Sequence, residues 1–312
     1  MSVIFIFIDG VGLGLNNKNN PLASSNWKSF SYFTEKKGLH IRCKEIDRPG
    51  HLFKAIDANL GVDGLPQSGT GQTTLFSGVN ASKIAGKHYG PFPYSTTRHL
   101  LEKKSLFHKV MDMDKKPVFM NAYPDQFFER VEKRDRWTAS TLMVRSAGIP
   151  LHRVKHVRNG KAITAEITQT VWREKLHIEV PVITQEDAAE RMIKASKDNE
   201  LVFYEFYLTD KAGHRMDPDY AEEIRELLDP FLMYIIENIG KKDTLVISSD
   251  HGNLEDLSIK THTRNPVPLF VKGYTAPFRT AKNLTDVTPG IVSVLKKDDI
   301  YSSGDFFKGK AE

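Results

Sequence analysis

Five short apolar runs, rich in β-branched and aromatic residues, constrain the fold of this 312-residue chain more than any other feature. The first run, Val3–Ile8, is apolar at every position, which is typical of a strand buried on both faces of a parallel sheet. The same pattern returns at Pro117–Asn121, Leu201–Leu208, Thr244–Ser249 and Val267–Val271. The five runs together predict a central sheet.

Segments with helical spacing of apolar residues lie between these runs. They are Thr96–Met113, Gln185–Ser196 and Asp219–Ile239, in which apolar residues recur at intervals of three and four. Strands that alternate with helices indicate an α/β fold with a doubly wound, mostly parallel sheet. In such a sheet, ligands bind beyond the carboxyl ends of the strands.

The stretch from residue 127 to residue 182 departs from this alternation because it is rich in charged residues. The pattern predicts a hairpin over His152–Ile167 that turns at Arg158-Asn159-Gly160, since Asn-Gly favours the positive φ of a tight turn. We therefore expect a core formed by residues 1–126 and 183–312, with residues 127–182 inserted as a small α+β cap.

Composition excludes several classes of protein. Lys and Arg number 44 and Asp and Glu 39, and this net charge of +5 is too small to indicate binding to nucleic acid. Cys43 is the only cysteine, so no disulfide forms within the chain, and we expect a reducing, cytoplasmic environment. The apolar start is far shorter than the ~20 residues that a membrane span needs. We expect neither a nucleic acid nor a membrane as partner.

Acidic and imidazole side chains follow the predicted strands. An Asp at a strand end is often only a helix cap or turn former, and a lone His is usually structural. However, Asp and neutral His are ligands that Zn²⁺ and Mn²⁺ accept, and six such groups at one sheet edge would repel one another without cations between them. The six are Asp9, Asp210, His214, Asp250, His251 and His262.

Two glycine-containing segments need separate interpretation. Gly10, Gly12 and Gly14 follow the first strand, but their G-x-G-x-G spacing and the neighbouring Asp9 carboxylate disfavour a dinucleotide site. Ser68, within Leu65–Gly78, is expected at or just before a helix N-terminus, where negative charge is favoured. Its hydroxyl can simply cap the helix, and it becomes a nucleophile only if a cation or base assists it.

These motifs together resemble the alkaline-phosphatase superfamily. Within it, the chain is most similar to the metalloenzyme domain of cofactor-independent phosphoglycerate mutase and phosphopentomutase. The resemblance covers roughly residues 1–90 and 200–312. The matching motifs occur in the family's order: Ile8-Asp9-Gly10, Ser68-x-x-Gly71, Asp210-x-x-Gly213-His214, Asp250-His251-Gly252-Asn253 and His262-Thr263-x-Asn265-Pro266-Val267-Pro268.

The resemblance implies a site for two divalent metal ions, Mn²⁺ or Zn²⁺, and a serine nucleophile that forms a phosphoserine. The two ions would exceed the three carboxylates by one positive charge, so the site should attract a phosphate dianion. Thr70 is the alternative nucleophile. The first ion would be held by Asp9, Asp250, His251 and the Ser68 oxygen, and the second by Asp210, His214 and His262.

The chain also departs from the family pattern. The mutase motif around the serine is S-E-V-G-H, whereas this chain has Ser68-Gly-Thr-Gly-Gln72, with an amide where an imidazole is expected. The chain lacks room for the large second domain of that mutase. A sulfatase is disfavoured because Cys43 is remote from the serine segment and a C/S-x-P-x-R motif does not surround Ser68.

Three functions remain open at this stage. The first is a metal-dependent phosphohydrolase for a small phosphate ester, and the second is an intramolecular phosphotransferase that returns the phosphate to another hydroxyl of its substrate. The third is a metal-binding homologue without turnover. A cap that seals the cleft would favour the second, and a short insertion seals less well.

Substrate contacts are expected from basic side chains near the serine segment and in the cap, because guanidinium and imidazole groups bind phosphate or carboxylate. Glu205 and Tyr207 lie in a predicted strand, where alternation indicates a polar group on the sheet face and a packing aromatic. The sequence does not define an oligomeric state. The candidate contacts are Arg264, which is favoured by its position between His262 and Asn265, and one or two of Lys87, His88, Arg98, Arg130, Arg134, Arg136 and Arg145.

Overall fold

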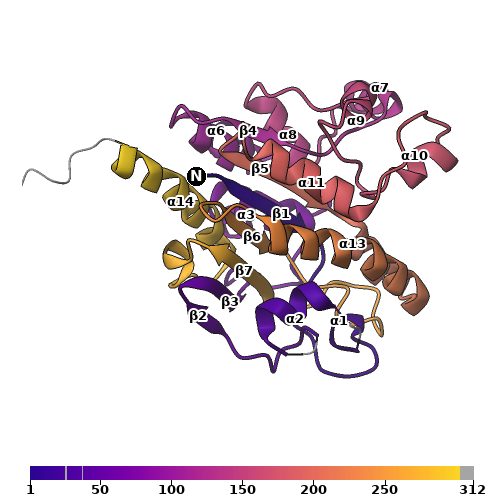
Figure 1. Cartoon of the computed structure of the whole chain (residues 1–312). Helices are drawn as coiled ribbons and strands as arrows, with labels where there is room; N and C mark the ends of the chain where they lie inside the picture. Colours follow the sequence, from indigo (N-terminus) through magenta and orange to yellow (C-terminus); the bar gives the residue numbers. More distant parts are fainter. Residues whose placement is uncertain (25–26, 37, 303–312) are drawn as a thin grey trace, which may run out of the picture.

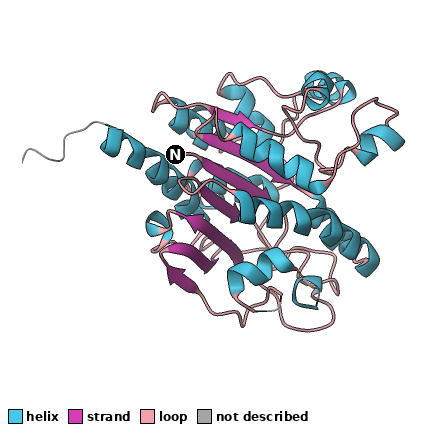
Figure 2. Cartoon of the chain, viewed as in Figure 1, coloured by secondary structure: helices cyan, strands magenta, loops and turns pink. Residues whose placement is uncertain are grey.

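The computed structural model describes residues 1–24, 27–36 and 38–302, which form one seven-stranded sheet with helices on both faces (Figures 1 and 2). The strand order is β2-β3-β7-β6-β1-β5-β4. The strands are β1 (Val3–Ile8), β2 (Ile46–Arg48), β3 (Gly50–Ile56), β4 (Pro117–Phe119), β5 (Leu201–Phe206), β6 (Thr244–Ser248) and β7 (Val267–Gly273).

The centre of the sheet is parallel. Strand β1 lies between β5 and β6, pairing Val3 with Leu201 on one side and with Thr244 on the other. Strand β4 extends this parallel half beyond β5. All six residues of β1 are buried, as expected for a strand covered on both faces. The mostly parallel α/β sheet expected from the five apolar runs is therefore confirmed.

The other half of the sheet is antiparallel. Strand β7 runs antiparallel to β6, β3 pairs with β7, and β2 pairs with β3 at the edge. The sequence pattern did not predict β2 or β3. In β3 the polar residues His51 and Lys54 interrupt the apolar run, so the segment lacks the continuous hydrophobicity of the central strands.

Alternation along β1 divides the core into two layers. Val3, Phe5 and Phe7 pack on one face of the sheet, whereas the intervening isoleucines pack on the other. The first face is covered by α3 (Ser68–Ser77), α5 (Arg98–Lys104), α6 (Leu106–Met111), α8 (Ala139–Ser146) and α14 (Val287–Ser302). The second is covered by α1 (Pro21–Ser24), α2 (Lys28–Thr34), α11 (Gln185–Ala195), α12 (Leu208–Arg215) and α13 (Pro218–Asn238).

The expected helices over Gln185–Ser196 and Asp219–Ile239 correspond to α11 and α13. The single helix expected over Thr96–Met113 is wrong, because the chain forms α5 and α6 with a break at Ser105. Ser105 has an extended backbone, and its hydroxyl pairs with His108 Nδ1 at 2.8 Å. This local side-chain bond competes with continued helical pairing.

The inserted region contains no hairpin over residues 152–167. Val154–Arg158 is the helix α9, and Gly160, with φ +69°, follows its end. A glycine at positive φ can end a helix as readily as it can form a hairpin turn. The Asn-Gly pattern alone therefore led to the wrong prediction. Val157 and Trp172 are buried in a small hydrophobic cluster that is separate from the two main core layers. The neighbouring helices are α7 (Asp125–Arg134) and α10 (Thr170–Glu174).

Helix α8 lies within the same insertion but packs differently, because Leu142, Met143 and Val144 join the core on the first face of the sheet. Helices α7, α9 and α10 lie together beyond the β5–β4 side (Figure 1). The remaining short elements are α4 (Ala81–Ala85), η1 (Ala276–Phe278) and η2 (Leu284–Asp286).

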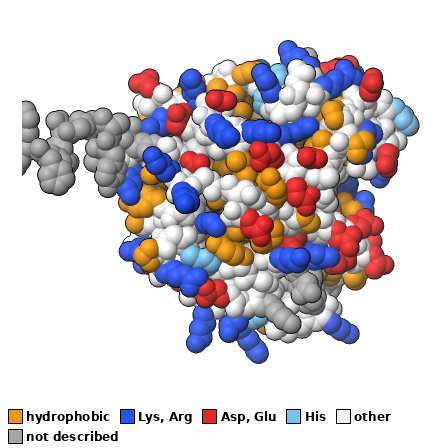
Figure 3. Space-filling model, in the orientation of Figure 1, with side chains coloured by type: hydrophobic (Ala, Val, Ile, Leu, Met, Phe, Trp, Pro, Cys, Tyr) orange, Lys and Arg blue, Asp and Glu red, His pale blue; other side chains and the backbone are white. Residues whose placement is uncertain are grey.

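The surface shown in Figure 3 mixes basic and acidic side chains, in keeping with the small net charge. Among the described residues, every helix is either too short or too polar to cross a lipid bilayer.

Candidate active site

The carboxyl ends of β1, β5 and β6 bring the predicted polar groups to one edge of the sheet. Asp9 follows β1, and Asp250 and His251 follow β6. Asp210 lies in the first turn of α12, directly after β5, and His214 lies one turn later on the same helical face. The parallel register of the three strands is what aligns these ends.

A first group consists of Asp9, Asp250 and His251, whose ligand atoms lie within 4.8 Å of one another. His251 Nε2 is 3.3 Å from Asp9 Oδ1 and 3.4 Å from Asp250 Oδ2. The Ser68 hydroxyl joins this group, because its oxygen lies 3.0 Å from His251 Nε2. All but Ser68 are buried.

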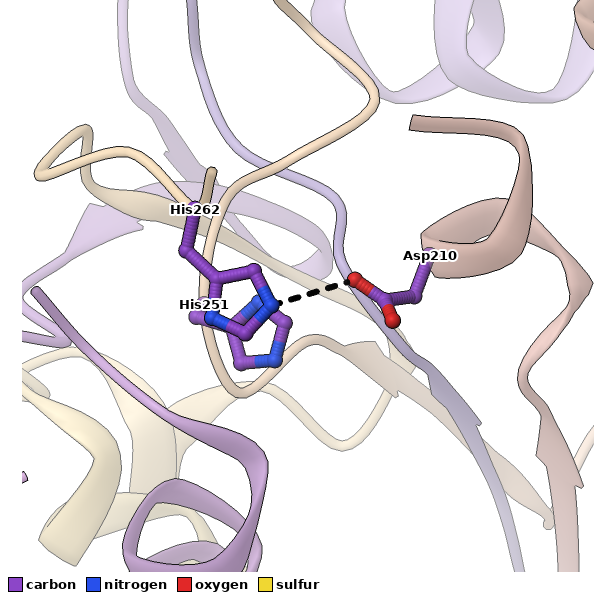
Figure 4. A group of neighbouring side chains, drawn as sticks. All are labelled: Asp210, His251 and His262. Atoms are coloured by element: carbon purple, nitrogen blue, oxygen red, sulfur yellow. Dashed lines mark ion pairs between the residues drawn. The ribbon is translucent and has the colours of Figure 1, made fainter. Parts of the chain in front are cut away.

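A second group consists of Asp210, His251 and His262, with ligand atoms that also lie within 4.8 Å of one another (Figure 4). His262 Nε2 is 3.5 Å from Asp210 Oδ1, and the His251 and His262 rings stack. His214 Nε2 completes the cluster at 3.3 Å from Asp210 Oδ2 and 3.2 Å from His262 Nε2. The two groups therefore meet at His251.

The tautomers of two histidines fit a cation site. His262 Nδ1 lies 2.7 Å from the Pro66 carbonyl, and His214 Nδ1 lies 2.8 Å from the Lys260 carbonyl. Because a carbonyl only accepts, each Nδ1 carries the proton and donates it. The two Nε2 atoms therefore face each other and Asp210. The hydrogen bond to Asp210 raises the pKa of His214, and a bound cation would replace the proton held between these atoms.

Without a cation, burial disfavours the charged forms of all three side chains in the first group. Burial, together with the neighbouring carboxylates, raises the pKa of Asp9 well above its ordinary value, and burial raises the pKa of Asp250 to about 8. Burial lowers the pKa of His251 to about 3, so this imidazole is neutral and cannot offset the carboxylates. Asp9 Oδ1 and Asp250 Oδ2 are buried without a hydrogen-bond partner. This donor set fits divalent metal ions.

The pKa of Asp210, the carboxylate of the second group, shifts in the opposite direction. Burial disfavours the charge of Asp210, but the His214 hydrogen bond, the other imidazoles and Asn253 outweigh burial and lower its pKa to about 2. Asn253 Nδ2 donates to Asp210 Oδ1 at 2.7 Å. Gln72, which stands where the family motif has an imidazole, donates from Nε2 to Asp9 Oδ2 at 3.1 Å. Both amides therefore orient candidate metal ligands.

Glu255 holds the supporting loops together, although the sequence pattern gave no sign of this role. Its buried carboxylate accepts from the Gly12 and Asn253 backbone N–H groups at 3.0 and 2.7 Å and also binds Thr263 and Asn265. A Cβ at Gly12 would lie 2.3 Å from Glu255 Oε1. Glycine at position 12 thus allows the backbone to approach the Glu255 carboxylate closely, rather than helping to bind a dinucleotide.

Ser68 is the first residue of α3, as expected, and its hydroxyl faces His251. Gly69 allows the neighbouring loop to approach this helix end, because a Cβ there would lie 2.1 Å from the Phe92 carbonyl. Thr70 is fully buried, and its hydroxyl accepts from the Tyr89 N–H at 3.1 Å. The two hydroxyls therefore point to different surroundings.

A cavity of about 690 Å³ opens between the candidate metal ligands and the inserted region. Asp9, Ser68 and Asp210 form its inner end, and the remaining wall comes from residues between 121 and 126, from residues between 127 and 176, and from Glu205 of β5 with the following Tyr207. The lining residues from these parts include Asn121, Tyr123, Gln126, Phe127, Arg130, Thr138, Glu166, Val171, Trp172, Leu176, Glu205 and Tyr207.

Most of the basic residues expected to contact substrate lie elsewhere. Lys87 packs over the Tyr94 ring, and His88 pairs with the Val62 carbonyl and the Ser82 hydroxyl. Arg264 is exposed outside the described cavity. Of the four cap arginines, Arg130 lines the cavity, and Arg134, Arg136 and Arg145 do not.

Glu205 was expected to be a polar group on the sheet face. It is indeed buried on β5, but it lines the cavity, and burial raises its pKa to about 7. Tyr207, expected to pack as an aromatic, is 45% exposed and lines the same cavity. The sequence feature that could have pointed to Glu205 is a carboxylate within an otherwise uncharged strand.

Comparisons with known proteins agree with this geometry. The model of the Metalloenzyme superfamily matches residues 154–298. A 2,3-bisphosphoglycerate-independent phosphoglycerate mutase from Thermococcus gammatolerans is 32% identical over 297 residues, which cover 86% of this chain and 70% of the mutase. A phosphopentomutase from Alkaliphilus metalliredigens is 28% identical over 102 residues, covering 31% of this chain and 26% of that protein.

Among solved structures, alkaline phosphatase from the Antarctic bacterium TAB5 has a similar fold, with a TM-score of 0.54 and 12% identity over 95% of this chain and 97% of that one. The sequence similarity supports a metal-dependent phosphoryl-transfer enzyme, and the structural similarity shows the same fold. The chain belongs to the metalloenzyme superfamily, with the 2,3-bisphosphoglycerate-independent phosphoglycerate mutases among its relatives.

Proposed function

We propose that the chain is a two-metal phosphohydrolase that cleaves small phosphate monoesters through a phosphoserine on Ser68. The carrying observation is the position of the Ser68 oxygen, 3.0 Å from His251 Nε2 at the inner end of the cavity. Ser68 begins a ten-residue helix, whose N-terminal N–H groups and dipole favour a phosphate there. The competing hydroxyl of Thr70 is buried against the Tyr89 loop.

The donor sets for two ions follow the clusters of the site. We assign Asp9, Asp250, His251 and Ser68 to one Mn²⁺ or Zn²⁺ ion and Asp210, His214 and His262 to the other. When bound, such ions lower the pKa of a hydroxyl and neutralise phosphoryl oxygens. Asn253 and Gln72 orient the carboxylates of Asp210 and Asp9.

The proposed reaction has two displacements at phosphorus. The Ser68 oxygen forms a bond to phosphorus while the ester P–O bond breaks, and the departing alcohol takes up a proton. Water then attacks phosphorus, the Ser68–phosphate bond breaks, and the serine regains a proton. The net reaction converts ester and water to alcohol and phosphate.

Hydrolysis is favoured over phosphate return by the rim of the cavity. Val171 and Leu176 line it from the insertion and are 37% and 40% exposed, and Gln126 and Arg130 are also exposed. An open rim admits water to the phosphoserine. The alternative of an intramolecular phosphotransferase is supported by the mutase names of the relatives.

An aryl phosphate assay with Mn²⁺ or Zn²⁺ tests the proposal. Wild-type protein should release phosphate, and Ser68→Ala should lose about a thousandfold or more in kcat because no other hydroxyl occupies its position. Ser77→Ala, at the other end of the same helix, should remain active. Mass spectrometry of acid-quenched enzyme should find the phosphate adduct on Ser68.

Four outcomes would redirect the proposal. Undiminished turnover by Ser68→Ala would refute the covalent route and point to attack by water. An adduct on Thr70 would move the nucleophile. Phosphate transfer to a second hydroxyl of a sugar phosphate, with little free phosphate, would identify the phosphotransferase, and silence with every metal and ester would favour a non-catalytic homologue.

A further inference from the structure

Two carboxyl groups that the proposed reaction does not use face the substrate cavity. Glu205 comes from β5 and Glu166 from the insertion, and they are 7% and 8% exposed. The basic side chain among the lining residues is Arg130, which is exposed on the opposite part of the insertion, on α7. The buried wall beyond the metal ligands is therefore acidic.

Neither carboxyl forms an ion pair within the described part of the chain. Glu205 Oε2 accepts a hydrogen bond of 2.5 Å from the neutral Ser140 hydroxyl. Glu166 Oε1 is buried and has no hydrogen-bond partner. A buried carboxylate oxygen without a partner is costly, so such an oxygen at a ligand cavity indicates that a bound donor completes it.

Aromatic rings share the wall with these carboxyls. Tyr123 and Phe127 stack with ring centroids 4.1 Å apart, and Trp172 and Tyr207 also line the cavity. The faces of such rings attract cations and reject anions. A wall made of carboxyl groups and aromatic ring faces is therefore suited to bind an organic cation.

We propose, resting on the proposed function, that the cavity binds phosphate monoesters whose alcohol portion carries an ammonium group, with Glu166 and Glu205 as its partners. The phosphate lies at Ser68 and the ammonium lies toward the insertion. An ester with a second anion, such as a carboxylate, places that charge against the acidic wall and is rejected. This specificity differs from that named for the phosphoglycerate mutases among its relatives.

The protonation behaviour of the two groups is consistent with this specificity. Burial raises the pKa of Glu205 to about 7. Burial also raises the pKa of Glu166, although its Thr164 neighbour and the N–H groups that begin α10 oppose the rise. A bound ammonium would favour the ionised form of both. The other ionisable groups at the cavity are Asp9, Asp210, Tyr123, Tyr207 and Arg130.

Matched esters of increasing chain length test the proposal. The probes are ω-aminoalkyl, ω-hydroxyalkyl and ω-carboxyalkyl phosphates, which share the phosphate and differ only in the distal group. At the best length, kcat/KM for the amino ester should exceed that for the hydroxy ester by roughly tenfold or more, and the carboxy ester should be the poorest.

Variants identify the residues responsible. Glu166→Gln and Glu205→Gln should each bring the amino-to-hydroxy ratio of kcat/KM toward one. Glu174→Gln, an exposed change on the neighbouring helix α10, should keep the wild-type ratio. Thermal melting checks that each variant is folded, and isothermal titration of the Ser68→Ala protein with the amino ester measures binding without turnover.

Two results would overturn the inference. Equal kcat/KM for the amino and hydroxy esters at every length would show that the wall does not select ammonium. A fall in melting temperature for Glu166→Gln and Glu205→Gln with an unchanged ratio would assign them to structure, for example to helix α10 alone. In both cases aryl phosphate hydrolysis by wild type would persist, whereas its absence would refute the proposed function instead.

Discussion

At the scale of single residues, the site is built from groups that are unfavourable on their own. Asp9 Oδ1 and Asp250 Oδ2 are buried without hydrogen-bond partners, and His214 Nε2 and His262 Nε2 lie 3.3 and 3.5 Å from the Asp210 oxygens. Proteins retain such groups where a bound ligand stabilises them. The lower folding stability of the ligand-free protein is the usual cost of function. Glu205 is the case in which this cost can be measured without metal.

At pH 8, the metal-free Glu205→Gln variant should have a higher free energy of unfolding than wild type. At pH 4, the difference in free energy of unfolding between the two should be smaller. Burial raises the pKa of Glu205 from 4.5 to about 7, so its favourable contribution is complete below pH 4.5 and is lost as pH rises to about 7. The loss is on the order of 3 kcal/mol at most. Urea unfolding in EDTA at several pH values measures it.

The control for this change is Glu237→Gln, because Glu237 is exposed on α13. Its difference from wild type should be small at every pH. A stability difference between Glu205→Gln and wild type that does not vary between pH 4 and pH 8 would contradict the raised pKa of Glu205.

At the scale of elements, one loop carries much of the site. Residues 249–263 hold Asp250, His251 and His262, and Glu255 ties this loop to the Gly12 backbone. Side-chain and loop contacts rather than regular secondary structure hold this loop: the Glu255 carboxylate, the Asn253–Asp210 hydrogen bond and the bond from the Leu254 N–H to the Gly10 carbonyl.

Glu255→Ala should lower the free energy of unfolding by about 3 kcal/mol or more, because it leaves several buried donors without an acceptor. It should also weaken Mn²⁺ binding, since the loop carries three candidate ligands. Urea unfolding and calorimetric titration measure the two effects. The exposed change Glu237→Ala should alter neither, and metal binding as tight as in wild type would show that the loop does not depend on Glu255.

The elements that the sequence predicted share a local signal. Continuous apolar runs marked β1, β5 and β6, and the motifs that follow these strands placed Asp9, Asp210 and Asp250 at their carboxyl ends. Strand β3 was not predicted because His51 and Lys54 interrupt its apolar run, and α9 was mistaken for a hairpin because Asn-Gly occurs both at the C-terminal ends of helices and in turns. The role of Glu255 was not predicted because its Gly12 partner lies 243 residues earlier, and that of Glu166 because only the folded chain brings it to the cavity.

At the scale of the whole molecule, bound ions would join four segments of the chain that lie far apart in sequence. EDTA should therefore lower the melting temperature by about 5 °C or more relative to protein saturated with Mn²⁺ or Zn²⁺, because a ligand that binds only the folded state stabilises it by ~2.7 kcal/mol at a hundredfold excess over Kd. Differential scanning fluorimetry measures this shift. Melting temperatures that coincide with and without added metal would contradict a stabilising metal centre.

The central place of β1 has a consequence for biosynthesis. This strand is translated before both of its neighbours, since β5 begins about 200 residues later and β6 about 240 residues later. At ribosomal speeds the Val3–Ile8 segment waits roughly 10 to 40 s for the first of them. During that interval a fully apolar segment is exposed to other nascent chains, and a ribosome-bound chaperone that shields it would raise the yield of native protein.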